Sequence, residues 1–318
     1  MNIAVLFVVF NRPDTTKQVF EAIRKAKPPR LYVAADGPRL NTPNDIEKTR
    51  EVREIILQNI DWDCEVKTLF RGKNIGCKEA VSGAISWLFE HEESGIILED
   101  DCLPHPDFFI FCDTLLTKYA DDERIAVITG NNFQNGIKRG DASYYFSKYN
   151  HVWGWATWRR AWKNYSGEIP FLPNWLNSDA WYEICPNFFE RRYWKRIFTK
   201  VYEGNFPTAW DYPWTACLWY NKQLTITPNV NLVSNIGFGE GSTHTNNINS
   251  LSNSMSTHSI DKLAHPSLIS RDLNADLYVY SHAYNNVFGG NKFSFPKVFT
   301  TIYQHVLSLT LPKSGSSN

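Results

Sequence analysis

The sequence has no excess of charge of either sign. Its 318 residues contain 33 Lys and Arg and 33 Asp and Glu, which gives a formal net charge of zero at pH 7. A neutral chain creates no long-range field that would draw nucleic acid or an anionic membrane to its whole surface. We therefore expect no nucleic-acid partner, and any anion has to be bound by local groups.

Long apolar runs and paired cysteines are also missing. No stretch approaches the roughly 18–20 uninterrupted apolar residues that span a bilayer. The six cysteines are scattered, with no Cys-x-x-Cys pair and no Cys/His cluster at the spacing of a zinc site. We expect buried, reduced thiols in a cytoplasmic protein, and a first strand in place of a secretion signal at Met1–Val5.

The last part of the chain is predicted to be peripheral to the fold. Residues 246–259 are rich in Asn, Ser and Thr, which is typical of a mobile loop and leaves a lid over the site as an alternative. Apolar residues then recur at helical spacing: Val298, Phe299, Ile302, Tyr303, Val306 and Leu307. Such a helix packs onto its own domain or lies on a partner or on the inner face of a membrane, and the sequence favours packing.

β-rich runs alternate with helical patterns in the first half of the chain. The runs cover 3–10, 31–35, 64–70 and 95–99, and the helical patterns cover 14–25, 45–59 and 78–91. This order is typical of βαβ units that build a mostly parallel sheet. Runs that are apolar throughout, such as Ile3–Phe10, suit strands buried on both faces. The predicted fold class is α/β, Rossmann-like, with helices on both faces of the sheet.

Polar residues stand where these runs end. They include Arg12, Asp36 and the triplet Glu99, Asp100 and Asp101. Ligands of such sheets collect at the carboxyl ends of the strands. Because Mg²⁺ and Mn²⁺ usually take only one or two carboxylates and complete their shell with water and phosphate oxygens, the triplet predicts a metal held together with a diphosphate. A solvated acidic turn that caps the next helix is the alternative.

The composition changes after about residue 140. Ten of the twelve tryptophans lie between residues 150 and 220. Such rings either form an aromatic core or stack on sugars, and we expect most of them to be core.

The triplet is followed by Cys-Leu-Pro-His-Pro-Asp-Phe-Phe. This stretch resembles the metal-binding strand of the N-acetylglucosaminyltransferase I family and related bacterial sugar transferases, which have the GT-A fold. The resemblance extends more loosely from residue 3 to about 244. It implies a GT-A fold with an aromatic-rich acceptor side, Asp101 as metal ligand, and Glu99 and Asp100 as contacts to the nucleotide sugar.

Three further positions match the family around the uridine and phosphates. They are Arg12, Asp36 and Lys78, the last of which stands where the family usually has His. Read alone, these residues are a surface Arg, a turn-forming Asp before Gly37 and an exposed helix Lys.

The segment around Asp211 resembles a Trp-Asp segment of the family, whose Asp removes a proton from the acceptor hydroxyl. A base must lie within hydrogen-bond reach and stay ionised, and we expect Trp210 and Trp214 to raise the pKa of Asp211. Asp211 is the predicted catalytic base. Its alternative role is the N-cap of a helix at 215–221.

Two glycine-containing segments complete the predicted site. The segment from Asn231 to His244 resembles family elements that close over the diphosphate, which makes Ser242 a phosphate contact and His244 a phosphate or metal ligand. Gly154 belongs to a segment that resembles the family's Gly-Trp element near the donor sugar. Close packing would also require a glycine there.

Together these residues predict a glycosyltransferase that depends on Mn²⁺ or Mg²⁺. It would move a sugar from a UDP-sugar to a hydroxyl of a glycan or lipid-linked glycan, with inversion implied by the family, as in polysaccharide biosynthesis. The predicted organisation is a nucleotide-sugar half at 1–140, an acceptor and catalytic half of the same domain at 141–245, and a loop with a helical extension at 246–318.

Two alternatives remain open. A sugar-nucleotide pyrophosphorylase would need a glycine-rich phosphate loop after the first strand, where residues 11–16 contain no glycine. A non-catalytic carbohydrate-binding protein would use the tryptophans to hold a glycan, because fold alone does not decide function.

Overall fold

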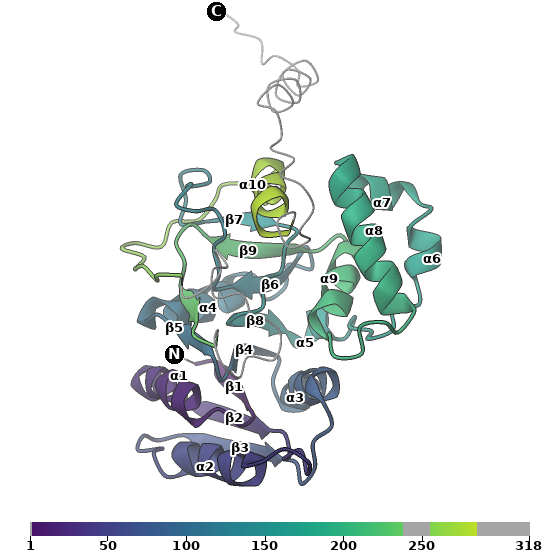
Figure 1. Ribbon diagram of the computed structural model, residues 1–318. Coiled ribbons are helices and arrows are strands. Elements are labelled where there is room, and N and C mark those ends of the chain that lie inside the picture. Colours follow the sequence, from purple (N-terminus) through teal and green to yellow (C-terminus); the bar gives the residue numbers. More distant parts are fainter. Residues whose placement is uncertain (1, 238–254, 285–318) are drawn as a thin grey trace, which may run out of the picture.

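A single large sheet runs through the protein (Figure 1). The structure is a computed structural model, and its described residues are 2–237 and 255–284. Eight strands form the sheet in the order β3-β2-β1-β4-β8-β6-β9-β7. The strands β1, β2, β3 and β4 are parallel, whereas β8 is antiparallel to both of its neighbours. The predicted α/β class with a mixed, mostly parallel sheet is confirmed.

The first half of the chain alternates strands and helices as predicted. Its elements are β1 (Ala4–Val9), α1 (Pro13–Ala26), β2 (Arg30–Ala35), α2 (Asp45–Leu57), β3 (Glu65–Phe70), α3 (Cys77–His91) and β4 (Ser94–Glu99). The helix α1 begins with Pro13, whose fixed backbone angle and missing N–H suit the first helical position. It ends where Lys27 adopts a left-handed conformation.

The second half extends the same sheet and adds a group of helices. The strands are β5 (Cys102–Pro104), β6 (Ile125–Thr129), β7 (Tyr144–Ser147), β8 (Trp155–Trp158), β9 (Leu224–Pro228) and β10 (Val233–Asn235). The helices are α4 (Pro106–Lys118), α5 (Arg159–Trp162), α6 (Leu172–Trp175), α7 (Asp179–Ile184), α8 (Phe188–Tyr202), α9 (Asp211–Tyr220), α10 (Leu273–Val279) and the π-helical η1 (Tyr280–Tyr284). The strands β5 and β10 form a separate antiparallel pair.

Alternating residues of β1 serve two cores, one on each face of the sheet. Val5, Phe7 and Val9 pack with residues of α1, α2 and α4. Ala4 and Leu6 pack with residues of α3, α5 and the group α6–α9. A parallel strand buried on both sides needs an apolar residue at every position, which is why the run is continuous.

The tryptophans of the second half are core, as expected. Of the ten between residues 150 and 220, all but Trp153 are buried. The rings of Trp194 and Trp219 lie 5.0 Å apart, as do those of Trp162 and Trp214. Such edge-to-face pairs stabilise a core beyond the area that they bury.

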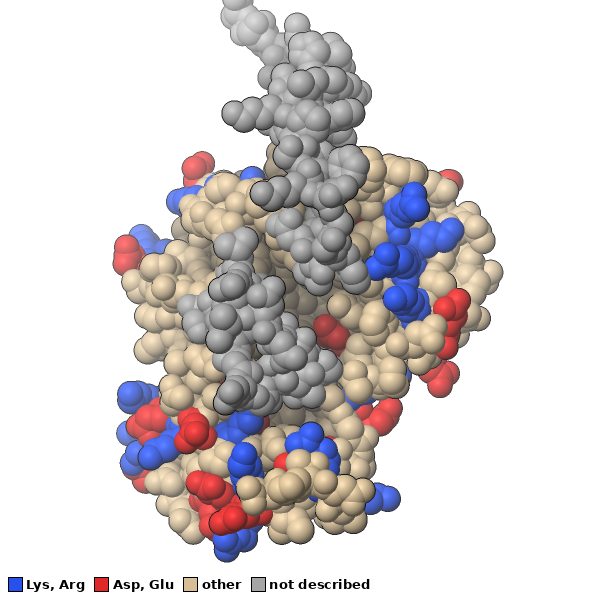
Figure 2. Space-filling model, viewed as in Figure 1, with Lys and Arg blue, Asp and Glu red and all other residues tan. Residues whose placement is uncertain are grey.

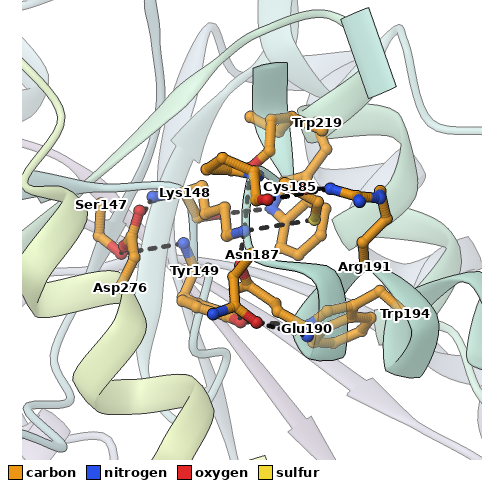
Figure 3. Close-up of polar contacts among 12 residues, drawn as sticks. Ser147, Lys148, Tyr149, Cys185, Asn187, Glu190, Arg191, Trp194, Trp219 and Asp276 are labelled. Carbon is orange, nitrogen blue, oxygen red and sulfur yellow. Dashed lines mark hydrogen bonds and ion pairs between the residues drawn. The ribbon is translucent and has the colours of Figure 1, made fainter. Parts of the chain in front are cut away.

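A buried lysine fastens this helical group to the sheet (Figure 3). Lys148 directly follows β7 and is fully buried, and its Nζ lies 2.8 Å from Glu190 Oε1 of α8. The same Nζ donates a hydrogen bond to the carbonyl oxygen of Ile184 and lies 4.3 Å from the ring centroid of Trp219. The hydroxyl of Tyr149 also donates to Glu190. Both charges are thus paired and hydrogen-bonded, as burial requires.

Asp276 of α10 ties a further helix to the same strand. It accepts hydrogen bonds from the hydroxyl of Ser147 and from the guanidinium of Arg271. Within the described part of the chain, no helix is long and apolar enough to cross a membrane.

We expect the loss of one charge of the Lys148–Glu190 pair to destabilise the fold strongly. Lys148→Met or Glu190→Gln leaves the partner charge buried and unpaired, which costs about 3–5 kcal/mol of unfolding free energy. The double variant should lose less than the sum of the single losses. Urea denaturation measures all three changes.

The matched control is the exposed pair of Lys222 and Glu183, whose side chains are 62% and 63% exposed. Lys222→Met should cost less than about 1 kcal/mol. A loss as small for Lys148→Met as for Lys222→Met would contradict the anchoring role of Lys148.

Candidate active site

The site lies where the strand order of the sheet reverses. From β1 the chain adds β2 and β3 on one side and returns to add β4 on the other. In the parallel pair of β1 and β4, Val8 faces Glu99. The residues after these two strands therefore meet at the carboxyl edge, where ligands of open α/β sheets bind.

Arg12 holds two of the three predicted acids. Its Nη2 lies 2.5 Å from Asp100 Oδ1, and its Nη1 lies 2.9 Å from Asp101 Oδ2. The backbone N–H of Phe10 donates to the other oxygen of Asp100 at 3.1 Å. Both oxygens of the buried Asp100 thus have partners inside the protein. The structure brings these residues together, with Arg12 in contact with the acids; its predicted contact to a nucleotide sugar stays a prediction.

Glu99 is the acid of the triplet that Arg12 does not pair. Among the described groups, none donates a hydrogen bond to its carboxyl group, which is partly exposed. Burial, and then the charges of Asp101 and Asp100, raise the pKa of Glu99 well above the ordinary value for glutamate. Three carboxyl groups thus stand at one strand end with a guanidinium that pairs two of them, and a divalent cation bound there would favour the ionised form of the third.

The next helix does not use the triplet as its cap. The N-cap of α4 is His105, whose Nδ1 accepts a hydrogen bond from the backbone N–H of Asp107. The alternative interpretation of the triplet as a helix cap is therefore wrong. Across the described ranges, no group of three His, Cys, Asp or Glu side chains is arranged to hold a metal ion. A cation bound here would depend on Asp101, water and substrate oxygens.

The small sheet of β5 and β10 brings Ile236 and Gly237 against Asp101. The backbone N–H of Ile236 donates to the carbonyl oxygen of Asp101 at 2.8 Å. A methyl group on Gly237 would lie 2.2 Å from Asp101 Oδ2 and 2.7 Å from Arg12 Nη1. Only glycine fits this close approach. Ser242 and His244 lie outside the described residues.

Asp36 and Lys78 have partners within the protein. Asp36 is buried and accepts from the backbone N–H of Ile75 and from Nδ2 of Asn74, so it holds the loop after β3. Nζ of Lys78 donates to the carbonyl oxygen of Gly167 at 3.2 Å and so links α3 to the second half of the chain. Both residues flank the carboxyl edge, and their contacts to a donor stay predictions.

Gly154 has a structural reason to be glycine. Its φ of 71° lies in the left-handed region, and a methyl group there would lie 2.7 Å from Cγ2 of Val233. Its carbonyl oxygen accepts from the backbone N–H of Gly130 at 2.8 Å. This geometry supports the alternative interpretation of Gly154, in which close packing requires a glycine, over a role next to the donor sugar.

Asp211 lies near the triplet, at the start of α9. Trp210 occupies the N-cap position, so the predicted N-cap role of Asp211 is wrong, and the helix begins before residue 215. The charge of Asp211 contributes to the raised pKa of Glu99. Such an effect requires proximity, because the interaction of two charges falls with distance and is screened by water. Asp211 is thus close enough for its charge to act on Glu99.

Cys77 is a site residue that the sequence did not reveal. It opens α3, and burial, followed by the charges of Glu99, Asp211 and Asp36, raises the pKa of its thiol to about 12. The positive charge of Arg12 lowers the pKa of the same thiol. The charges of four predicted site residues therefore act on this half-buried thiol. The one feature of the sequence that could have pointed to Cys77 is its position directly before Lys78, a predicted site residue.

No family model and no curated protein matches this chain. Several solved structures do. An apo UDP-glucose pyrophosphorylase is 9% identical over 72% of this chain and 90% of its own, with a TM-score of 0.37. A UDP-glucose pyrophosphorylase complexed with UDP-glucose is 13% identical over 52% and 79%, with a TM-score of 0.32. HddC from Yersinia pseudotuberculosis is 10% identical over 54% and 86%, with a TM-score of 0.31.

These values are too low to assign a reaction. None of these three structures is named as an N-acetylglucosaminyltransferase I. The resemblance to that family therefore stays a prediction.

We expect Gly237→Ala to disturb the contact between Arg12 and Asp101. The methyl group has no space, and moving the backbone or the two side chains should cost about 1–3 kcal/mol of unfolding free energy. Gly72→Ala is the matched control, because a methyl group there meets no atom within 4 Å. It should change stability by less than about 0.5 kcal/mol. Equal urea midpoints for the two variants would show that Gly237 is not constrained.

Proposed function

We propose that the protein is a metal-dependent glycosyltransferase that transfers a sugar from a UDP-sugar to a hydroxyl of a glycan or lipid-linked glycan. The observation that carries this proposal is the cluster of three acids at the switch point, where, among the described residues, Arg12 pairs with Asp100 and Asp101 and no cation pairs with Glu99. A sugar nucleotide brings a diphosphate, which binds beside carboxylates only when a cation lies between them.

Asp101 is the residue that we assign to the metal, with His244 as a second ligand. Arg12 engages one oxygen of Asp101, and the other faces the thiol of Cys102 at 3.4 Å. Mn²⁺ or Mg²⁺ bound there would neutralise charge on the leaving diphosphate. Asp100, whose oxygens are both engaged, has a positioning role, since it fixes Arg12. Glu99 faces the donor sugar.

The remaining roles follow from position around the same edge. Asp36, Lys78, Gly154 and Ser242 are assigned to the nucleotide and phosphates. Asp211 is assigned as the base that accepts the proton of the acceptor hydroxyl, which it can do only if it reaches that hydroxyl. Its proximity to Glu99 supports this role. A single displacement with inversion follows from the family resemblance.

A second candidate is a sugar-nucleotide pyrophosphorylase, the class that two of the similar structures carry in their names. That reaction needs a glycine-rich loop after β1, with a basic side chain that is available to bind phosphate. Here the residues after β1 contain no glycine, and their one basic side chain, Arg12, is ion-paired with the triplet. The geometry therefore favours the transferase. Carbohydrate binding by exposed tryptophans is disfavoured, because most of these rings are buried.

We expect Mn²⁺ to strengthen the binding of UDP through Asp101. In calorimetry, the affinity of the wild-type protein for UDP should rise by at least about tenfold, or 1.4 kcal/mol, when Mn²⁺ is added. Asp101→Asn should lose this increase, whereas Asp63→Asn, at an exposed site on the other edge, should keep it. Equal UDP affinity with and without Mn²⁺ in the wild type would rule out the proposed function.

We expect Asp211→Asn to separate binding from turnover. The variant should bind UDP and Mn²⁺ like the wild type, because the amide has the shape of the carboxylate. Its rate of UDP release from the UDP-sugar selected by screening should fall about 10²–10⁴-fold, since the base is lost.

Near-normal turnover of the variant would remove Asp211 as the base. A parallel assay with UTP and sugar 1-phosphates distinguishes the second candidate: release of pyrophosphate, with no UDP released from any UDP-sugar, would assign the pyrophosphorylase reaction.

A further inference from the structure

Helix α8 has one buried face and one exposed face. Its buried residues are Glu190, Trp194, Ile197, Phe198 and Val201. The opposite side exposes Phe188, Phe189, Arg192, Lys195 and Arg196, which we call the basic–aromatic face. These five side chains recur at helical spacing, so they lie along one side of the helix.

The basic–aromatic face contributes three cations and no acid of α8 itself. The one acid of α8 is Glu190, which points inward and pairs with Lys148 (Figure 3). Figure 2 shows Lys and Arg gathered over α8, whereas blue and red side chains are mixed around α1 and α2. In a protein with no net charge, this is a local basic surface.

Exposed aromatic rings lie at the first turn of the same helix. Phe188 and Phe189 are each 58% exposed, and their rings are 5.5 Å apart. The guanidinium of Arg191 lies 4.8 Å from the ring centroid of Tyr182, which is also exposed, and 5.9 Å from that of Phe188. Large apolar side chains that stay exposed beside cations mark an interaction surface.

We infer that the basic–aromatic face docks the protein on an anionic lipid bilayer. A bilayer surface offers phosphates to the cations and an apolar boundary to the phenyl rings in one plane. A helix of 15 residues is about 22 Å long and lies flat on such a plane. Nucleic acid offers phosphates too, but a convex helix with two adjacent phenyl rings at one end suits a layered surface better.

The docking helix is close to the candidate active site. The rings of Trp194 in α8 and Trp219 in α9 lie 5.0 Å apart, and Trp194 also contacts Tyr212. Asp211 is the first residue of α9. Docking through α8 would therefore hold the site near the membrane surface, whichever reaction it catalyses. This surface differs from the predicted C-terminal helix, which lies outside the described residues.

Cosedimentation of the full chain with vesicles tests the inference. The protein should bind vesicles of phosphatidylcholine with phosphatidylglycerol and not vesicles of phosphatidylcholine alone, and added salt should weaken the binding. In the variant with Arg192→Gln, Lys195→Gln and Arg196→Gln, the partition coefficient should fall on the order of 100-fold, since each cation near an anionic surface contributes about 1 kcal/mol. Phe188→Ser with Phe189→Ser should also weaken binding and keep the salt dependence.

The matched control removes the same charge elsewhere. Lys17→Gln, Lys48→Gln and Arg50→Gln lie on the exposed sides of α1 and α2 and should leave vesicle binding unchanged. The inference is overturned if the full chain ignores anionic vesicles, or if the control triple loses as much binding as the α8 triple. Binding of duplex DNA or single-stranded RNA by the same face, with no vesicle binding, would assign it to nucleic acid instead.

Discussion

The site depends on the ion pairs of Arg12 with Asp100 and Asp101. Two parallel strands end side by side at the switch point of the sheet, and this arrangement places three carboxylates in one partly buried space. Like charges so close together repel unless a cation lies between them. Arg12 neutralises part of this charge and so lets the two strand ends approach. The carboxyl group of Glu99, which Arg12 leaves unpaired, is the feature on which the proposed site for a divalent cation and a diphosphate depends.

A second buried ion pair shapes both the interior and the surface. The buried charge of Lys148 requires a carboxylate, and Glu190 supplies it from α8. This contact fixes the helical group against the sheet and thereby places α9, with Asp211, beside the triplet. It also takes the one acid of α8 out of the solvent, so the exposed side of that helix carries cations and aromatic rings. One interaction thus links the packing of the core to the character of a surface.

Much of the fold followed from local patterns. The strands β1, β2, β3 and β4 and the helices between them lie close to their predicted ranges, because strands buried on both faces are apolar throughout and the helices have a repeating apolar side. The positions of Arg12 and the acidic triplet were predictable because polar residues mark the ends of such strands. The start of α9 and the cap of α4 were not, since the N-cap positions fell to Trp210 and His105, which are unusual there.

The sequence by itself determined the α/β class, the polar residues at the strand ends and the aromatic core, because each of these depends on the periodicity and chemistry of neighbouring residues. Only the tertiary structure decided that Arg12 faces Asp100 and Asp101, that the thiol of Cys77 is exposed to the charges of Glu99 and Asp211, and that Lys148 is buried with Glu190. These facts depend on side chains that are distant in the chain. Their pairing follows from how the strands and helices pack, and no local pattern encodes it.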